Sequence, residues 1–112
     1  MLSLPNTREV VVYRSVNAAG LVQYVGITVD LEVRAAAHLA EKGIEITSIP
    51  GLSNLSRPDA RAVEQVLINT YGLGKNGGAL LNQINSISKT NPIYESAIQR
   101  GTELLIQAGY RP

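Results

Sequence analysis

The chain has 112 residues, 45% of them hydrophobic, and its 10 basic and 9 acidic residues give a net charge of +1. This predicts one folded domain without a positive field over the whole molecule, so any nucleic-acid binding needs a local basic patch. There is no cysteine, which excludes disulfides, thiolate zinc sites and cysteine nucleophiles, and no apolar run approaches the roughly 18 residues of a membrane span. Residues 1–6 have neither a basic stretch nor a long apolar stretch, so we expect no signal peptide.

Two runs rich in β-branched residues, 9–16 (EVVVYRSV) and 21–28 (LVQYVGIT), flank the short loop 17–20 (NAAG). This pattern predicts an antiparallel hairpin. With a four-residue loop, Val16 pairs with Leu21, and Tyr13 lies directly opposite Tyr24 on the same face of the sheet. A shift of one residue would separate the two tyrosines, so the inference depends on the register.

Residues 30–42 (DLEVRAAAHLAEK) predict a helix that Thr28 or Asp30 can cap and that Gly43 can end. Arg34 and His38 lie one turn apart on it. They form either an exposed basic stripe or a guanidinium that binds a phosphate with an imidazole beside it. The alternating residues 44–49 (IEITSI) then predict a third strand, which Pro50-Gly51 ends.

The residues 56–59 (SRPD) are typical of a helix start, with a serine cap and a proline in the first turn. We expect this helix to run to Tyr71, before Gly72. Glu64 is the one acid in its apolar stretch, residues 60–68. Spacing alone favours a solvated glutamate; the alternative is a carboxylate ligand for a hard divalent cation such as Mg²⁺.

Residues 71–80 contain four glycines and predict a loop, although not a P-loop, because the required spacing is absent. Lys75 and Lys89 lie in an acid-free stretch, residues 65–94, that would suit a phosphate backbone. Asn91-Pro92 predicts the start of a last helix that runs to Gly109. The expected order is β-β-α-β-α-α, a small α+β domain with a three-stranded, mostly antiparallel sheet. We divide it into a leader (1–8), a core (9–90) and a C-terminal helix (91–109).

Five elements in this order resemble the GIY-YIG nuclease superfamily. They are Val11-Val12-Tyr13, Tyr24-Val25-Gly26, the helix with Arg34 and His38, Glu64 in its helix, and Leu80-Leu81-Asn82. The first signature departs from the family pattern at its glycine and isoleucine but keeps the tyrosine that carries the chemistry.

The resemblance implies an endonuclease that hydrolyses phosphodiester bonds with one Mg²⁺ or Mn²⁺ ion at Glu64. Arg34 would bind the phosphate, and Tyr13 and Tyr24 would position the attacking water, one of them as general base. His38 would assist or take that role itself, and Asn82 would hold the phosphate end or brace the site. We therefore expect Tyr13, Tyr24, Arg34 and Glu64 to converge on one concave face.

Residues 52–94 also resemble C-terminal toxin domains of contact-dependent inhibition and Rhs-type polymorphic toxins. This implies a module of a larger secreted bacterial toxin that acts in the cytoplasm of the target cell and is neutralised by an immunity protein. DNA is the favoured substrate and RNA, tRNA in particular, the alternative. A repair or mobile-element nuclease and an inert nucleic-acid-binding domain are the other interpretations. The sequence leaves the oligomeric state open.

Overall fold

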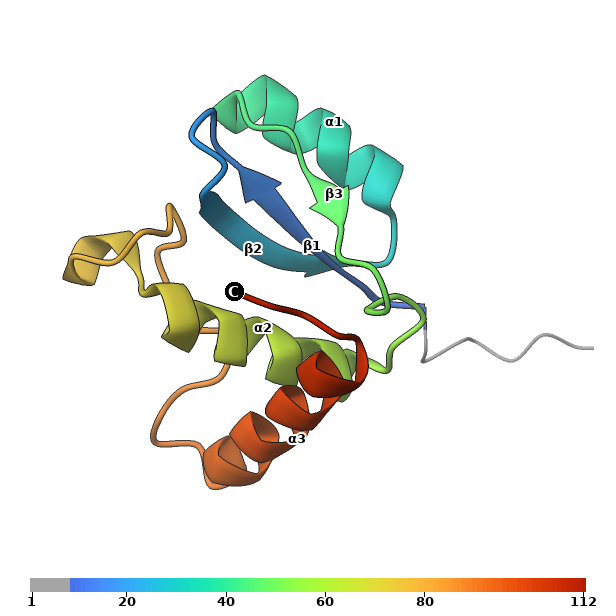
Figure 1. Ribbon diagram of the computed structural model, residues 1–112, viewed down its shortest axis with the longest axis vertical. Helices are drawn as coiled ribbons and strands as arrows, with labels where there is room; N and C mark the ends of the chain where they lie inside the picture. The colour runs from blue at the N-terminus through green and yellow to red at the C-terminus, as the bar shows by residue number, and fades with distance from the viewer. Residues whose placement is uncertain (1–8) are drawn as a thin grey trace, which may run out of the picture.

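The computed structural model describes residues 9–112, and the predicted leader lies outside them. Within this range the chain forms an α+β fold whose order, β-β-α-β-α-α, confirms the predicted fold class (Figure 1). The antiparallel sheet has the order β2-β1-β3. Its elements are β1 (Val11–Val16), β2 (Val22–Thr28), α1 (Leu31–Lys42), β3 (Thr47–Ser48), α2 (Arg57–Tyr71), the short 3₁₀ helix η1 (Gly74–Asn76) and α3 (Tyr94–Gln107).

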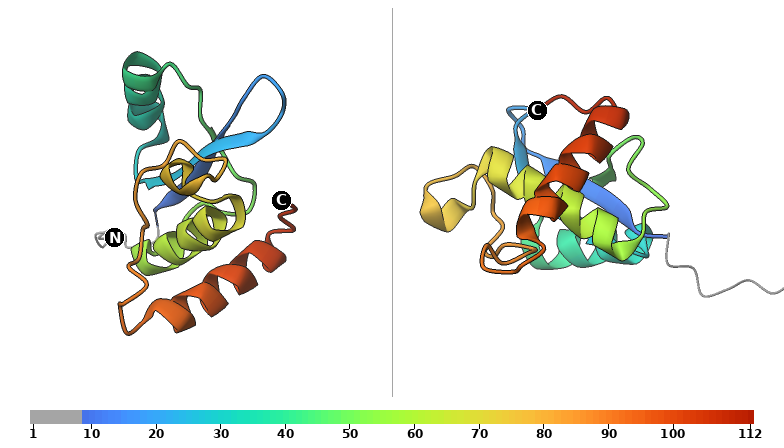
Figure 2. Two further views of the ribbon diagram at one scale, coloured as in Figure 1. Left: turned by 90° about the vertical axis from the view of Figure 1, so that its left-hand side faces the viewer. Right: turned by 90° about the horizontal axis from the view of Figure 1, so that it is seen from below.

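The sheet lies between helices on its two faces. Helix α1 covers one face, α2 lies against the other, and α3 packs on the outer side of α2 (Figures 1 and 2). No helix in residues 9–112 is long and apolar enough to cross a membrane.

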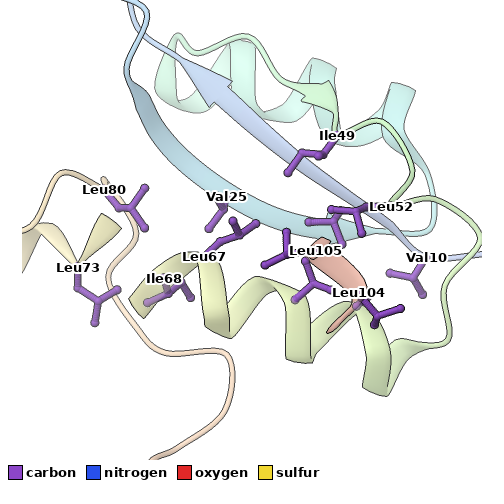
Figure 3. Packing of buried hydrophobic residues seen from close by; sticks show 13 residues of the cluster. Val10, Val25, Ile49, Leu52, Leu67, Ile68, Leu73, Leu80, Leu104 and Leu105 are labelled. Carbon is purple, nitrogen blue, oxygen red and sulfur yellow. The ribbon is translucent and has the colours of Figure 1, made fainter. Parts of the chain in front are cut away.

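The main apolar core fills the space between the sheet and the layer of α2 and α3 (Figure 3). Val12 and Val25 face it from the sheet, and α2 and α3 contribute Leu67 and Leu105. A smaller cluster lies on the other face of the sheet, where Tyr13 packs with Ile44 and Ile46 near α1. The alternation of side chains along β1 thus sends Val12 into the main core and Tyr13 toward α1.

Local signals in the sequence define most helix ends correctly. The Asp30 carboxylate accepts a hydrogen bond from the Val33 N–H, and Gly43 ends α1 in the left-handed conformation. At α2, Ser56 caps and Gly72 ends the helix. These ends confirm the predictions, because a cap depends only on residues a few positions apart.

The start of α3 was predicted wrongly. The helix begins at Tyr94, not at Pro92, and Ile93 stands at its N-cap without a side-chain hydrogen bond. Asn91 instead closes a turn, in which its side chain accepts from the Ile93 N–H and its carbonyl accepts from the Tyr94 N–H.

The third strand is also shorter than predicted, with only Thr47–Ser48 in the ladder. The backbone N–H of Ile44 donates to the His38 carbonyl and so prolongs the end of α1 instead of pairing with β1. Ile44 and Ile46 are buried beside Tyr13, so their alternating pattern reflects packing under α1 more than strand pairing.

The register of the hairpin differs by two residues from the predicted one. Tyr13 pairs with Gly26, and Ser15 pairs with Tyr24. Two local features cause the shift. Asn17 and Leu21 bond to each other and close the loop, and Gln23 is an extra residue, because Ser15 pairs with Tyr24 while Val16 pairs with Val22. From Val11 to Ser15 the shift is two residues, which keeps these side chains and their partners on the predicted faces, whereas Val16 pairs one residue away from the predicted partner.

Candidate active site

Tyr13 and Tyr24 lie on the same face of the sheet, which confirms that part of the prediction. They are diagonal neighbours, not directly opposed, with ring centroids 6.4 Å apart and planes inclined by 19°. The Tyr13 ring lies over Gly26, where any Cβ atom would overlap Cζ and Oη of Tyr13. Gly26 is therefore the residue that makes room for this ring between the sheet and α1.

His38 reaches the two tyrosines from α1. Its Nε2 lies 2.8 Å from Tyr13 Oη, and its ring packs edge-on against Tyr24 with 4.9 Å between centroids. Burial raises the pKa of Tyr13 and lowers that of His38, to which the charges of Lys42 and Arg34 also contribute. At neutral pH the phenol is therefore protonated and the imidazole neutral, so the hydrogen bond between Tyr13 Oη and His38 Nε2 joins two uncharged groups.

Arg34 brings a positive charge to the same cluster. Burial raises the pKa of Tyr24 as it does that of Tyr13, and the Arg34 charge opposes this rise in both tyrosines. A side-chain hydrogen bond from Arg34 also lowers the pKa of Tyr13. Arg34 is itself exposed on α1, so part of its guanidinium is free to meet an anion.

A cleft of roughly 410 Å³ lies beside the outer edge of β2, and Tyr24 and Glu64 both line it. Glu64 comes from α2, on the other side of the sheet from α1, and is half-buried. Burial raises the pKa of Glu64, while a hydrogen bond from Ser86 and the charge of Arg61 oppose the rise. The carboxylate in turn raises the pKa values of both tyrosines, because its negative charge disfavours a second one nearby.

Three cations line this cleft beside Glu64, namely Lys42, Arg57 and Arg61. Neither arginine was predicted as a site residue. Their spacing of four residues, with Glu64 three residues after Arg61, was the available signal, because it places all three on neighbouring turns of one helix. Lys42 comes from the end of α1 and meets them only in the folded chain.

The residues around Glu64 fit a hard divalent cation of the Mg²⁺ type. Within residues 9–112 no three histidine or acidic side chains gather as a metal-binding cluster, and Glu64 is the only acid among the residues that line this cleft. Mg²⁺ needs only one or two protein carboxylates, since water and phosphate oxygens complete its octahedron. A half-buried carboxylate with a raised pKa also gains most from a cation, which would favour its ionised form.

Asn82 is buried, and both polar atoms of its side-chain amide form hydrogen bonds with the backbone of Val25. Oδ1 accepts from the Val25 N–H at 3.1 Å, and Nδ2 donates to the Val25 carbonyl at 2.8 Å. Of the two roles expected for this residue, the contacts fit the brace. The side chain takes the place of a neighbouring strand at the outer edge of β2.

Gln65 is a second brace, and sequence reasoning missed it. It is fully buried next to Glu64 and accepts a hydrogen bond from the Ile87 N–H at 2.8 Å, while its amide donates to Asn85 and Asn69. These contacts hold Ile87 by its backbone and Asn85 by its side chain, on the two sides of Ser86, which interacts with Glu64. A glutamine next to Glu64 in an otherwise apolar helix stretch was the only signal in the sequence.

Lys75 and Lys89 do not line this cleft. Lys75 lies on η1, and Lys89 lines a second pocket of roughly 300 Å³ beside that helix. Asn85 lines both the cleft and this pocket, so the two adjoin.

A comparison of the chain with protein-family models, curated proteins and solved structures found no match.

Proposed function

We propose that this domain is a metal-dependent endonuclease of the GIY-YIG type that hydrolyses phosphodiester bonds of DNA. The observation that carries the proposal is the meeting of Tyr24 and Glu64 in one cationic cleft, with Arg34 and the Tyr13–His38 pair behind Tyr24. A carboxylate, a phenol and several cations within one cleft suit a phosphate ester and an attacking water.

The two tyrosines take different roles in this proposal. Tyr13 is only 1% exposed and does not line the cleft, so it is a positioning residue that holds His38 through its hydroxyl. Tyr24 lines the cleft and is the group that orients the attacking water and accepts its proton. Burial and the charge of Glu64 raise the pKa of Tyr24, so its phenolate form depends on the opposing charge of Arg34 and on a cation held at Glu64.

Arg34 does not itself line the cleft, and in this proposal its exposed guanidinium binds a non-bridging oxygen of a scissile phosphate that lies at the Tyr24 end of the cleft. The water oxygen then bonds to phosphorus while the bond to the leaving oxygen breaks. Glu64 would hold Mg²⁺ or Mn²⁺, which when bound supplies positive charge to the phosphate and the leaving oxygen. Lys42, Arg57 and Arg61 bind the flanking phosphates.

The likeness of residues 52–94 to polymorphic toxin domains supports a biological setting for this activity. We propose that the domain is the effector part of a larger secreted bacterial toxin and acts in the cytoplasm of a target cell. An immunity protein in the producing cell would neutralise it by covering the cleft.

The test is to incubate the purified domain with plasmid DNA or with total tRNA, with Mg²⁺ or with a chelator. We expect Mg²⁺-dependent cleavage of DNA that Glu64→Gln abolishes, while Glu45→Gln, which changes an exposed glutamate away from the cleft, cleaves normally. Cleavage of tRNA alone would reassign the substrate to RNA. Cleavage of neither by a folded domain would refute the proposal.

The roles of the tyrosines are separated in the same assay. Tyr24→Phe should lower kcat by roughly a hundredfold or more with little change in KM, as expected for loss of a general base. Tyr13→Phe should have a smaller effect on kcat and mainly alter its pH profile, because His38 loses its partner. Equal losses in the two variants would contradict this assignment.

A further inference from the structure

Residues 81–87, here called the cleft segment, have no regular secondary structure but are fixed at both ends. At one end the Leu81 N–H donates to the Gln23 carbonyl at 2.7 Å, and Asn82 is bonded to Val25. At the other end Ile87 is buried, and its N–H donates to Gln65. The backbone between these anchors is therefore held in place against the cleft.

The middle of the cleft segment presents an aliphatic side chain to solvent. Ile84 is 73% exposed and lines the cleft, as does Leu81, which is 48% exposed. A single exposed aliphatic residue is common on protein surfaces, but two on one anchored segment at the mouth of a cleft form an apolar contact point.

The surroundings of Ile84 indicate what it contacts. Lys42, Arg57 and Arg61 line the same cleft, so the cleft combines three cations with an apolar tip. Nucleic acid offers the complementary pair of chemistries, since its phosphates bind cations and the faces of its bases are apolar. The faces of stacked bases are hidden, however, and become available only where a base step opens.

We propose that Ile84, supported by Leu81, packs against an unstacked base, so that the domain prefers DNA with an unpaired nucleotide to a fully paired duplex. This inference rests on the proposed function and names its substrate class. Aliphatic wedges between base steps are an established way to bend and open DNA. A base without a partner costs less to unstack, and that difference creates the preference.

The experiment measures binding with a chelator present, so that cleavage does not interfere. One fluorescently labelled DNA duplex is fully paired, and the other has the same sequence with one unpaired adenine at its centre. We expect the domain to bind the second duplex about tenfold more tightly. Ile84→Ala should remove this preference and change the affinity for the paired duplex by less than about twofold.

Ile106→Ala is the matched control, because Ile106 is 72% exposed on α3 and lines none of the cleft. It should keep the full preference. A second readout is 2-aminopurine next to the unpaired position, whose fluorescence should rise on binding the wild-type domain and not on binding Ile84→Ala. This readout reports unstacking directly.

Four outcomes would overturn the inference. If the domain binds both duplexes equally, or if Ile84→Ala keeps the preference, the wedge is wrong while Glu64-dependent cleavage of DNA still supports the proposed function. If neither duplex is bound and none is cleaved with Mg²⁺, the proposed function fails as well. If Ile84→Ala weakens only the binding of a protein partner, the Ile84 side chain belongs to a protein interface and not to a contact with DNA.

Discussion

Gly26 shows how a single residue that lacks a side chain positions Tyr13 and, through it, His38. The Tyr13 ring occupies the space above it, and the Tyr13 hydroxyl reaches His38 from there. The glycine of a tyrosine–valine–glycine signature marks a family resemblance in the sequence. In the structure it has a steric reason, because the paired register places it directly across from Tyr13.

Gly26→Ala should therefore disturb the site through Tyr13. The new methyl group overlaps the ring, so we expect a loss of about 1–3 kcal/mol in the free energy of unfolding and a broken Tyr13–His38 hydrogen bond. Urea denaturation measures the first effect. Combining the change with Tyr13→Leu should cost less than the sum of the two single losses, whereas strict additivity would show that the overlap is relieved elsewhere.

Glu64 should make the domain less stable than it would be with a neutral residue. Burial raises its pKa in the folded state, so ionisation costs more there than in the unfolded chain. This cost is absent below the unfolded pKa near 4 and is complete above the raised folded value. In metal-free buffer at pH 7 we therefore expect the Tm of Glu64→Gln to be a few degrees higher than that of wild type. At this chain length the shift corresponds to about 1 kcal/mol or less in the free energy of unfolding.

The same comparison at about pH 3 is the control, because both states then hold the proton and the difference in Tm should vanish. Glu45→Gln, at an exposed position, should show no such pH-dependent difference. A Glu64→Gln variant that is less stable at pH 7 than at pH 3, relative to wild type, would contradict the sign. Such a result would indicate that Arg61 and Ser86 compensate the buried charge in full.

At the scale of elements, strand β2 depends on a side chain to complete one of its edges. Asn82 satisfies the N–H and the carbonyl of Val25, and Leu81 bonds to Gln23. An amide side chain has one donor and one acceptor in the geometry of a peptide group, so it can substitute for a neighbouring strand.

Asn82→Ala should therefore act on stability first. It leaves two buried backbone groups of Val25 without partners, and we expect a loss of about 2–4 kcal/mol. Hydrogen exchange of the Val25 amide should accelerate. Gln83→Ala, an exposed neighbour, should change neither quantity. If Asn82→Ala keeps full stability but loses cleavage, the amide contacts the substrate and is not a brace.

The starts of α1 and α2 could be predicted from neighbouring residues, whereas the start of α3 and the register of the hairpin were predicted wrongly. Asp30 and Ser56 mark helix starts by local hydrogen bonds, and both were recognised. The hairpin register depends on an extra residue at Gln23, whose carbonyl bonds to Leu81 far along the chain. The side-chain pattern of the strands survived this error because it repeats every two residues.

The residues of the candidate site also divide into those that could be predicted from the sequence and those that could not. Tyr24 and Glu64 could be proposed from signatures, and the structure brings them to one cleft. Gln65 and Ser86 gave no such signal, since their role depends on residues 85–87 returning to α2. Lys42 could not be assigned either, because only the packed fold brings the end of α1 to the arginines of α2.

Over the whole molecule, the net charge of +1 hides an uneven distribution of the charged residues. Lys42, Arg57 and Arg61 gather at the cleft, and the acids are elsewhere except for Glu64. This is the local patch that a nearly neutral chain needs to bind a polyanion.

The salt dependence of DNA binding should report this patch. The slope of log K against log salt concentration falls by roughly one for each phosphate that is no longer neutralised, so replacing all three cations by glutamine should lower it by up to about three. Binding titrations of a DNA duplex at several salt concentrations measure the slope. Lys75→Gln should leave the slope unchanged, because Lys75 lines neither the cleft nor the adjoining pocket. If Lys75→Gln lowered the slope as much as replacing a cleft cation does, the DNA would lie over η1.

The covered edge of β2 also bears on how the domain avoids aggregation. An open strand edge is a template for pairing with another chain, and here the cleft segment covers that edge at Gln23 and Val25. The residues that close the edge are therefore the residues that border the cleft. Detachment of this one segment would open the cleft and expose an edge ready for intermolecular pairing, so a ligand that holds the segment in place should also protect the domain from aggregation.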